Sequence, residues 1–372
     1  MTEIVSTPVP LVDLAAQHVR IADEVAAGWA EVLERTAFIS GPQVAEFEEA
    51  YAAFSGVRHC VGVANGTDAV ELSLRALDIR PGDECVLPAN TFIATAEAVA
   101  RTGAVPVLVD CDPDTALIDV DATAAAITPR TRAVLPVHLY GQTVPIEQLY
   151  AVLPAGVSIV EDAAQAQGAR RYGLPAGALG DIAATSFYPG KNLGAYGDAG
   201  AVTTSSTRLA DAVRLLREHG SPRKYEHAVA GMNSRLDTLQ AVVLSAKLRL
   251  LEEWNDARRL AAKRYDALLA SYDEVITPVV LPGNEPVWHL YVVRVAERDR
   301  VLESLHAKGI GAGIHYPTPV HLTGAFAHLE HRDGDFPIAE RLAGEILSLP
   351  LFPEITVSQQ ERVVDAVAEA IR

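Results

Sequence analysis

The chain has 372 residues, and its 31 Lys and Arg against 48 Asp and Glu give a formal net charge of −17. This acidic balance argues against a nucleic-acid partner, because nucleic-acid binding needs clustered positive charge. No uninterrupted apolar run reaches the roughly 18 residues that a membrane helix needs, so we expect no membrane partner. Hydrophobic residues make up 49% of the chain and charged residues 21%, a balance typical of folded globular proteins.

The N-terminus and the cysteines bear on the compartment in which the protein works. The opening residues MTEIVSTPVP lack a basic region followed by an apolar one, so they predict no secretory signal. Cys60, Cys85 and Cys111 are few and odd in number, and their spacing fits no metal site. They indicate buried apolar side chains in a reducing compartment, so we expect a cytoplasmic protein without a metal.

The first part of the chain predicts a large α/β domain. Residues 13–35 fit an amphipathic helix, and Gly41-Pro42 starts a second helix. From Cys60 to about Thr204, strand-like apolar runs alternate with helical patterns, which predicts a mostly parallel sheet covered by helices. The expected strands are 60–64, 84–87, 105–109, 132–137, 157–160, 182–187 and 200–204.

The C-terminal part predicts a smaller α+β domain. The chain is too long for one compact core, so we expect a large domain at 1–250 and a small domain at 251–372. The expected elements around and after this boundary are a helix at 208–219, a polar segment at 220–233, a long helix from 236 to about 272 that breaks near 254–256, a strand at 288–294 and a helix at 298–308.

A candidate anion site follows the first strand of the predicted sheet. Asn65-Gly66-Thr67-Asp68 opens a helix directly after the strand 60–64. The free N–H groups at the start of a helix bind anions, Gly66 allows close approach of the backbone, and Thr67 adds a hydroxyl. The same four residues also fit an ordinary helix cap and turn, so this motif alone leaves both interpretations open.

An acidic pair marks the end of another strand. Glu161 and Asp162 directly follow the buried run 157–160, at the edge of the sheet where α/β proteins bind ligands. A cofactor bound through a lysine Schiff base needs an acid on its pyridinium nitrogen, and Asp162 fits that role. Acids in this position also serve as helix caps. His138 follows a neighbouring strand, and we expect it to support the site rather than act as a base.

The third motif places a lysine in a loop between two strands. Lys191 lies in the stretch Ser186-Phe187-Tyr188-Pro189-Gly190-Lys191-Asn192-Leu193-Gly194. Burial favours the neutral amine of a lysine, and a neutral amine can attack a carbonyl to form a Schiff base. A surface lysine is the alternative for this residue alone, but the neighbouring motifs favour the reactive one.

In this order, the three motifs resemble the DegT-type sugar aminotransferases, which are fold type I enzymes that use pyridoxal 5′-phosphate (PLP). The resemblance covers nearly the whole chain and implies a large α/β domain with a smaller α+β domain at the C-terminus. It extends to Pro10-Leu11-Val12-Asp13-Leu14, Gly41-Pro42, Asn233-Ser234-Arg235-Leu236-Asp237, His315-Tyr316-Pro317 and Leu347-Ser348-Leu349-Pro350.

The resemblance implies a cofactor site built around PLP. Lys191 would hold the cofactor covalently and Asp162 would face its ring nitrogen, as the two catalytic residues. Phe92 lies at the end of a strand and would stack on the flat ring, with a core phenylalanine as the alternative. The other implied cofactor-binding residues are Gly66, Thr67, Asp68, Gln165 near the phenolic oxygen of the ring, Ser186 on the phosphate, and Asn233.

Further residues are implied on the substrate side and between subunits. Asn233 would reach the phosphate of the neighbouring subunit's cofactor, which implies a homodimer with shared active sites. Lys224 and Tyr225 lie in the polar segment 220–233 and suit a nucleotide diphosphate, with a solvated loop as the alternative. The remaining implied substrate residues are Tyr188, His315 and Tyr316, for which a purely structural role is the alternative.

The implied activity is amino transfer from an amino acid, L-glutamate by resemblance, to a keto carbon of a nucleotide-linked deoxysugar in deoxyaminosugar and antibiotic biosynthesis. In a related deoxygenating branch a histidine replaces the lysine, so Lys191 favours amino transfer. The lysine loop is most similar to members that act on 3-keto sugars, with dTDP as the implied nucleotide, and C4 stays open. The alternatives are an aminotransferase of keto-cyclitols and a non-catalytic PLP-binding sensor of sugar nucleotides.

Overall fold

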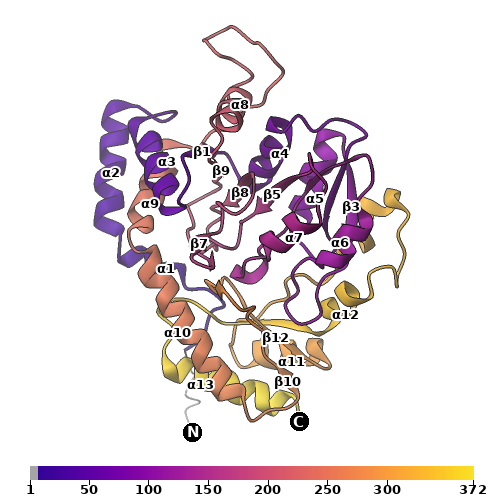
Figure 1. Cartoon of the computed structure of the whole chain (residues 1–372). Coiled ribbons are helices and arrows are strands. Elements are labelled where there is room, and N and C mark those ends of the chain that lie inside the picture. The colour runs from indigo at the N-terminus through magenta and orange to yellow at the C-terminus, as the bar shows by residue number, and fades with distance from the viewer. Residues whose placement is uncertain (1–6) are drawn as a thin grey trace.

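The computed structural model describes residues 7–372, and its centre is a seven-stranded sheet with the spatial order β1-β9-β8-β5-β4-β2-β3 (Figure 1). The strands from β8 to β3 pair in parallel, whereas β9 runs antiparallel to both of its neighbours, β8 and β1. The mostly parallel sheet predicted from the sequence is therefore confirmed. Its strands are β1 (His59–Val63), β2 (Glu84–Pro88), β3 (Val105–Val109), β4 (Thr131–Val134), β5 (Ser158–Asp162), β8 (Ile182–Ser186) and β9 (Gly200–Thr204).

Helices cover this sheet, so its strands are almost entirely buried. Helix α4 packs on α5, α8 and the strands β8 and β9, while α3 packs on β1 and α9. The helices around the sheet are α1 (Leu14–Val19), α2 (Ala22–Arg35), α3 (Pro42–Phe54), α4 (Gly66–Ala76), α5 (Ile93–Thr102), α6 (Val120–Ala126), α7 (Ile146–Val152), α8 (Thr207–Arg217) and α9 (Thr238–Leu248).

Two predicted helices differ from those in the structure. The single helix expected at 13–35 is two helices, because the chain turns at Arg20 and Ile21 between α1 and α2. The long helix expected to break near 254–256 breaks instead at residues 249–250, between α9 and α10 (Leu251–Leu269). Asn255 stays inside α10 because its side chain is buried and hydrogen-bonded to the large sheet region, a long-range contact that local sequence does not reveal.

The C-terminal part has its own small sheet and hydrophobic core. Strands β10, β12 and β13 form an antiparallel sheet, and α10, α11 and α13 supply much of the core beside it. We propose the boundary between the two domains at residues 250–251, where α10 begins. The remaining elements are β6 (Arg170–Arg171), β7 (Leu174–Pro175), β10 (Val275–Ile276), β11 (Asn284–Glu285), β12 (Tyr291–Val295), α11 (Arg298–Ala307), α12 (Pro337–Glu345), β13 (Ile346–Leu349), α13 (Val357–Ala370) and 3₁₀ turns at Leu139–Gly141, Val320–Leu322 and Gly324–Leu329.

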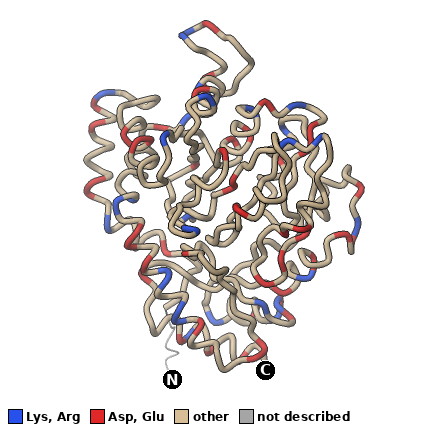
Figure 2. The backbone as a smooth tube through the Cα atoms, viewed as in Figure 1, with Lys and Arg blue, Asp and Glu red and all other residues tan. Residues whose placement is uncertain are grey.

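A long arm at residues 218–233 projects from the body of the molecule beside α8 (Figure 1). Bridges between Glu218 and Asn233 and between Arg223 and Glu226 join its two sides. Figure 2 shows acidic and basic positions dispersed over the whole chain, and the arm carries both kinds.

Two findings concern the termini and membranes. None of the helices in residues 7–372 combines the length and the apolar character of a membrane span. Residues 1–6, part of the N-terminal stretch expected to carry no secretory signal, lie outside the described residues.

Candidate active site

A cavity of about 620 Å³ opens at the carboxyl ends of the parallel strands. Strands β2, β4, β5 and β8 each deliver residues to it at or just beyond their ends. This is the edge at which open α/β sheets bind their ligands. The residues predicted for the site that line this cavity are Gly66, Thr67, Phe92, Asp162, Gln165, Ser186, Tyr188, Lys191, His315 and Tyr316.

The loop between β8 and β9 places Lys191 at the cavity. The backbone N–H of Lys191 donates to the carbonyl of Tyr188 (2.9 Å), which closes a tight turn. A Cβ added at Gly194 would collide with the carbonyl of Pro189, so only glycine allows this close approach. Phe187 is fully buried and anchors the loop in the core. The sequence around the lysine therefore fixes its position on the cavity.

Electrostatics favour a reactive amine at this position. The side chain of Lys191 is half-buried and lines the cavity. Burial lowers the pKa of Lys191 to about 8, and the carboxylate of Asp162 acts in the opposite direction. A large fraction of the amine is therefore neutral near pH 8, which is the form that can attack a carbonyl.

Asp162, the last residue of β5, is held by donors to both of its oxygens. The hydroxyl of Thr95 donates to Oδ2 (2.8 Å), and the backbone N–H of Ala164 donates to Oδ1 (3.1 Å). The hydroxyl oxygens of Thr91 and Thr95 lie 2.9 Å apart. Because Thr95 donates its one hydroxyl proton to Asp162, Thr91 is the donor to Thr95. This directed chain fixes the orientation of a carboxylate that faces the cavity.

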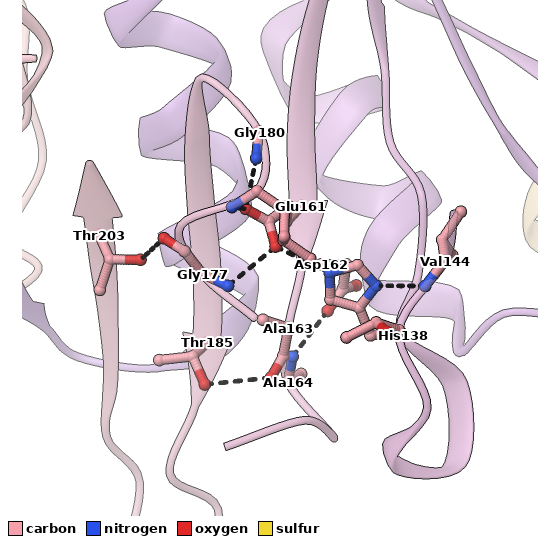
Figure 3. A network of polar contacts seen from close by, with 12 residues as sticks. His138, Val144, Glu161, Asp162, Ala163, Ala164, Gly177, Gly180, Thr185 and Thr203 are labelled. Atoms are coloured by element: carbon pink, nitrogen blue, oxygen red, sulfur yellow. Dashed lines mark hydrogen bonds and ion pairs between the residues drawn. The ribbon is translucent and has the colours of Figure 1, made fainter. Parts of the chain in front are cut away.

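Glu161 lies one residue earlier and serves the scaffold instead (Figure 3). Its fully buried carboxylate accepts hydrogen bonds from the backbone N–H groups of Gly177, Leu179 and Gly180, at 2.7–2.8 Å. His138 Nδ1 accepts the N–H of Val144 (3.1 Å), so Nε2 carries the proton that His138 donates to Glu161 (2.8 Å). Successive side chains of a strand point to opposite faces, so Glu161 points into the scaffold and Asp162 faces the cavity.

The N-terminus of α4 forms an anion cradle on the same cavity. The side chain of Asn65 accepts the N–H of Asp68 (2.8 Å), and among residues 7–372 no partner is found for the N–H groups of Gly66 and Thr67. A Cβ added at Gly66 would lie 2.6 Å from the Cβ of Ser186, so glycine keeps this space open. Two free N–H groups, two hydroxyls and the positive end of an 11-residue helix fit a phosphate group.

Aromatic side chains form one wall of the cavity. The ring of Phe92 is 51% exposed and lies 5.2 Å from the ring of Tyr316. The Gln165 amide connects this wall to the 3₁₀ turn at Leu139–Gly141, because it accepts the backbone N–H of Tyr140 (2.6 Å) and donates to the hydroxyl of Tyr316 (3.1 Å). The exposed face of Phe92 suits stacking on a flat ring.

His315 and Tyr188, which were also predicted to bind the substrate, line the cavity. They differ in burial and in hydrogen bonding. The Nδ1 atom of His315 lies 2.8 Å from the hydroxyl of Ser348. Burial and the charge of Lys191 lower the pKa of His315 to about 4, so its ring is neutral at neutral pH. The side chain of Tyr188 is 60% exposed and is free to contact a bound ligand.

Four predicted residues do not reach the cavity of their own chain. Asp68 is buried in α4, where its carboxylate lies 3.6 Å from the guanidinium of Arg101, and it does not line the cavity. Lys224 and Tyr225 lie on the projecting arm, and Tyr225 is 84% exposed. Asn233 lies at the base of that arm, on the strand-like side that pairs with Glu218. None of these three residues lines the cavity of its own chain.

Sequence reasoning also missed residues that the structure brings to the site. Thr91 and His289 line the cavity, and Thr95 lies directly behind Asp162. The spacing of Thr91 and Thr95, four residues apart at the start of α5, would place them on one face of a helix. His289 interrupts an otherwise apolar run before β12, which was the only local signal for it.

The fold, the half-buried lysine, the carboxylate at the end of β5 and the anion cradle together define a PLP-dependent transferase of fold type I. The chain belongs to the DegT/DnrJ/EryC1/StrS aminotransferase family, whose model matches residues 19–368. Aminotransferases of this family bind PLP, and the free N–H groups and the space left by Gly66 fit its phosphate. The chain is therefore an aminotransferase.

Two relatives and one solved structure support this assignment. The chain is 45% identical to dTDP-3-amino-3,4,6-trideoxy-alpha-D-glucose transaminase of Streptomyces venezuelae, with 99% of this chain and 98% of the relative covered. It is 44% identical to UDP-N-acetyl-3-dehydro-alpha-D-glucosamine 3-aminotransferase of Acidithiobacillus ferrooxidans, with 98% and 99% covered. The crystal structure of S. venezuelae DesV in complex with a ketimine intermediate superposes with a TM-score of 0.96 at 45% identity, covering 99% of this chain and all of DesV.

Proposed function

We propose that this protein transfers an amino group from L-glutamate to the C3 keto carbon of a dTDP-linked keto-deoxysugar, in the biosynthesis of a deoxyaminosugar. One observation carries the proposal: Lys191, Asp162 and the N-terminus of α4 open on a single cavity. The names of both relatives support a 3-amino or 3-keto position, and they differ in the nucleotide, which is dTDP in one and UDP in the other. The position 3 printed in both names favours C3 over C4.

The residues of the cavity divide the work of holding PLP. When bound, PLP supplies an electron sink that lets a proton leave the α-carbon of an amino acid. We assign the covalent link to Lys191, the partner of the ring nitrogen to Asp162, and the ring face to Phe92. The phosphate contacts are assigned to Gly66, Thr67 and Ser186, and the contact near the phenolic oxygen to Gln165.

The same lysine has a second task in this proposal. Once its amine is released, Lys191 takes the proton from the α-carbon of the donor and later returns a proton, as general base and then general acid. A pKa of about 8 suits both directions, since the ideal acid–base group titrates near the working pH. The neutral His315 and the hydroxyls of Tyr188 and Tyr316 are assigned to the sugar nucleotide.

The arm at residues 218–233 is assigned to a second copy of the chain. Asn233 would reach the cofactor phosphate of the neighbouring subunit, and Lys224 and Tyr225 would approach its nucleotide diphosphate. Their absence from the lining of the cavity of their own chain and the projection of the arm support this assignment (Figure 1). The protein is therefore proposed to be a homodimer with shared active sites.

A substrate screen tests the proposed reaction. The holoenzyme is incubated with L-glutamate and, in separate reactions, dTDP-linked 3-keto sugar, dTDP-linked 4-keto sugar, UDP-linked 3-keto sugar and a keto-cyclitol. Formation of 2-oxoglutarate and of the aminated product is measured by mass spectrometry. We expect the highest kcat/KM with the dTDP-linked 3-keto sugar. A higher kcat/KM with the 4-keto sugar or with the cyclitol would refute the assignment.

Mixing two variants tests the shared site. In a shared dimer, one chain with Lys191→Ala and one chain with Asn233→Ala together assemble one intact site from the two wild-type residues. Mixing the purified variants under conditions of subunit exchange should therefore raise the activity above the sum of the separate activities. A mixture that only averages its components would place Asn233 in the site of its own chain or outside both.

A further inference from the structure

Ser348, a buried residue of β13, contacts a ring that lines the cavity. Its hydroxyl oxygen lies 2.8 Å from Nδ1 of His315, and its side chain is fully buried. Two backbone hydrogen bonds with Gly313 and the pairing of β13 with β12 hold Ser348 in place. In the part of the chain that the structure describes, no second partner is found for its hydroxyl.

Only one direction of this hydrogen bond leaves no buried group unpaired. If Nδ1 of His315 were the donor, the hydroxyl proton of Ser348 would have no acceptor among the described residues. A buried hydroxyl without an acceptor costs free energy, so the hydroxyl donates and Nδ1 accepts. Because burial lowers the pKa of His315 to about 4, the ring is neutral and carries one proton. That proton therefore lies on Nε2.

The N–H at Nε2 of His315 is a free donor at the cavity. His315 lines this cavity, and no partner for its Nε2 is found among the described residues. The neighbouring Tyr316 is directed in the same way. The carboxamide oxygen of Gln165 accepts the N–H of Tyr140, so the amide nitrogen donates to the hydroxyl oxygen of Tyr316. The proton of that hydroxyl is then also free for a ligand.

Two neighbouring donors suit a ligand oxygen that carries no proton of its own. Among the described residues that line the cavity there is no arginine, and Lys191 is the one lysine. The proposed function commits Lys191 to the cofactor and the N-terminus of α4 to the cofactor phosphate. These assignments leave the carboxylate of the amino-acid donor to the side of the cavity where His315 and Tyr316 present their protons.

We propose that Ser348 is a positioning residue that fixes the proton of His315 on Nε2, and that this N–H binds the carboxylate of the amino-acid donor. The inference rests on the proposed transfer from L-glutamate and adds to it the group that holds the donor. The amino acid and the keto sugar occupy the cavity in turn, so the same N–H is available to an oxygen of the sugar in the second half of the reaction.

Nitrogen NMR tests the position of the proton without any turnover. The holoenzyme is prepared with nitrogen-15-labelled histidine as the wild type and as Ser348→Ala, and the signals missing from His315→Phe identify the ring. We expect the proton of the wild-type ring on Nε2 and a larger share on Nδ1 in Ser348→Ala. A wild-type ring protonated on Nδ1, or the same proton position in both proteins, would overturn the role of Ser348.

The first half of the reaction tests the ligand. PLP-loaded protein is mixed with L-glutamate without any sugar, and the loss of visible absorbance gives an apparent Kd and a limiting rate. Ser348→Ala should raise the apparent Kd about tenfold, in line with the loss of one hydrogen bond to a charged group, and should change the limiting rate little. Ser73→Ala is the control and should leave both unchanged, because the hydroxyl of Ser73 is also fully buried but donates to the carbonyl of Ala69 within α4.

A double-mutant cycle separates an effect through His315 from a general loss of structure. In a His315→Phe background, Ser348→Ala should not weaken L-glutamate any further. Additive losses at equal thermal stability, or a wild-type Kd for Ser348→Ala alone, would overturn the proposal.

Two further outcomes separate the ligand and the proposed function. Calorimetry with dTDP alone should give the same Kd for Ser348→Ala and the wild type. Weaker binding of dTDP at an unchanged Kd for L-glutamate would assign the N–H to the nucleotide and overturn the carboxylate assignment. A wild-type protein that L-glutamate does not convert would overturn the proposed function, and the NMR measurement would still decide the role of Ser348.

Discussion

Two regions of the molecule each bury a lysine, and only one of them forms a candidate active site. Burial lowers the pKa of Lys247 to about 8, the same value as for Lys191. Lys247 lies on α9, where its ammonium sits 5.0 Å from the ring centroid of Tyr196. Lys191 lies on a loop and lines a cavity that also contains Asp162.

The comparison shows that desolvation alone does not define a catalytic lysine. Lys247 lies on a helix against the ring of Tyr196, and it does not line the cavity that contains Lys191. Around Lys191, the ends of β5 and β8 and the start of α4 supply an acid, a flat aromatic face and a phosphate cradle. Topology therefore decides which of two equally perturbed amines can react.

The largest expected effect is a loss of kcat, which we expect for a variant of Lys191 and not for a variant of Lys247. Lys191→Ala should lower kcat at least a thousandfold, because it removes both the covalent link and the general base. Lys247→Met should retain most of the activity, because the methionine fills the same apolar contact without taking part in the reaction. Steady-state kinetics on both variants, with circular dichroism to establish folding, make the measurement. An active Lys191→Ala protein would contradict the comparison.

The pH dependence of PLP capture sharpens the comparison further. Below pH 8 the ammonium of Lys191 predominates and cannot attack the aldehyde, so the capture rate should rise about tenfold per pH unit up to about pH 8 and then level off. Between pH 6 and pH 8 the neutral fraction grows about fiftyfold. Stopped-flow absorbance over pH 6–10 gives the profile. A rate that keeps rising toward pH 10.5 would show an ordinary lysine.

A methyl group added at Gly66 tests whether the anion cradle at the N-terminus of α4 holds the phosphate of PLP. Gly66→Ala places a Cβ 2.6 Å from the Cβ of Ser186 and closes the space proposed for the phosphate. We expect PLP to bind roughly tenfold to thirtyfold more weakly, as overpacking by a single carbon costs about 1–2 kcal/mol. Spectrophotometric titration measures the dissociation constant.

The control for the cradle is Gly324→Ala, since nothing lies within 4 Å of a Cβ added at Gly324. This variant should bind PLP with the wild-type dissociation constant. If Gly66→Ala bound PLP as tightly as Gly324→Ala, the phosphate would have to lie elsewhere in the cavity.

The smallest expected effect concerns the hydroxyl behind Asp162. Thr95→Val keeps the shape of the side chain and removes the donor to Oδ2, and kcat should fall about tenfold while KM for the donor changes little. Thr95→Ser keeps a hydroxyl and should restore kcat to within about threefold. Equal kcat for Thr95→Val and the wild type would mean that Asp162 is oriented without Thr95.

The sequence predicted those parts of the site that local motifs encode. The lysine loop, the strand end at Asp162 and the helix start at Gly66 are short stretches whose strand, turn and cap signals lie within a few residues of the reactive group. The parallel sheet then brings their ends together, so correct strand assignments were enough to group Lys191 with Asp162.

The parts that could not be predicted depend on contacts between distant segments. Thr95 and Asp162 are separated by 67 residues, and Asn192 and His289 by 97, so no local pattern connects either pair. The break between α9 and α10 was misplaced because the burial of Asn255 against the large domain holds that residue in the helix. Lys224 and Tyr225 were assigned to the nucleotide diphosphate because of the polar composition of their segment. Composition does not predict the direction in which the arm projects, because the fold sets that direction.

The central claim is that Lys191, rather than the equally perturbed Lys247, forms the covalent link to PLP. Holoenzyme treated with borohydride carries a stable pyridoxyl group, which tryptic peptide mapping by mass spectrometry assigns to one residue. The account predicts the tag on the peptide that contains Lys191. A tag on Lys247, or on any other side chain, would contradict it.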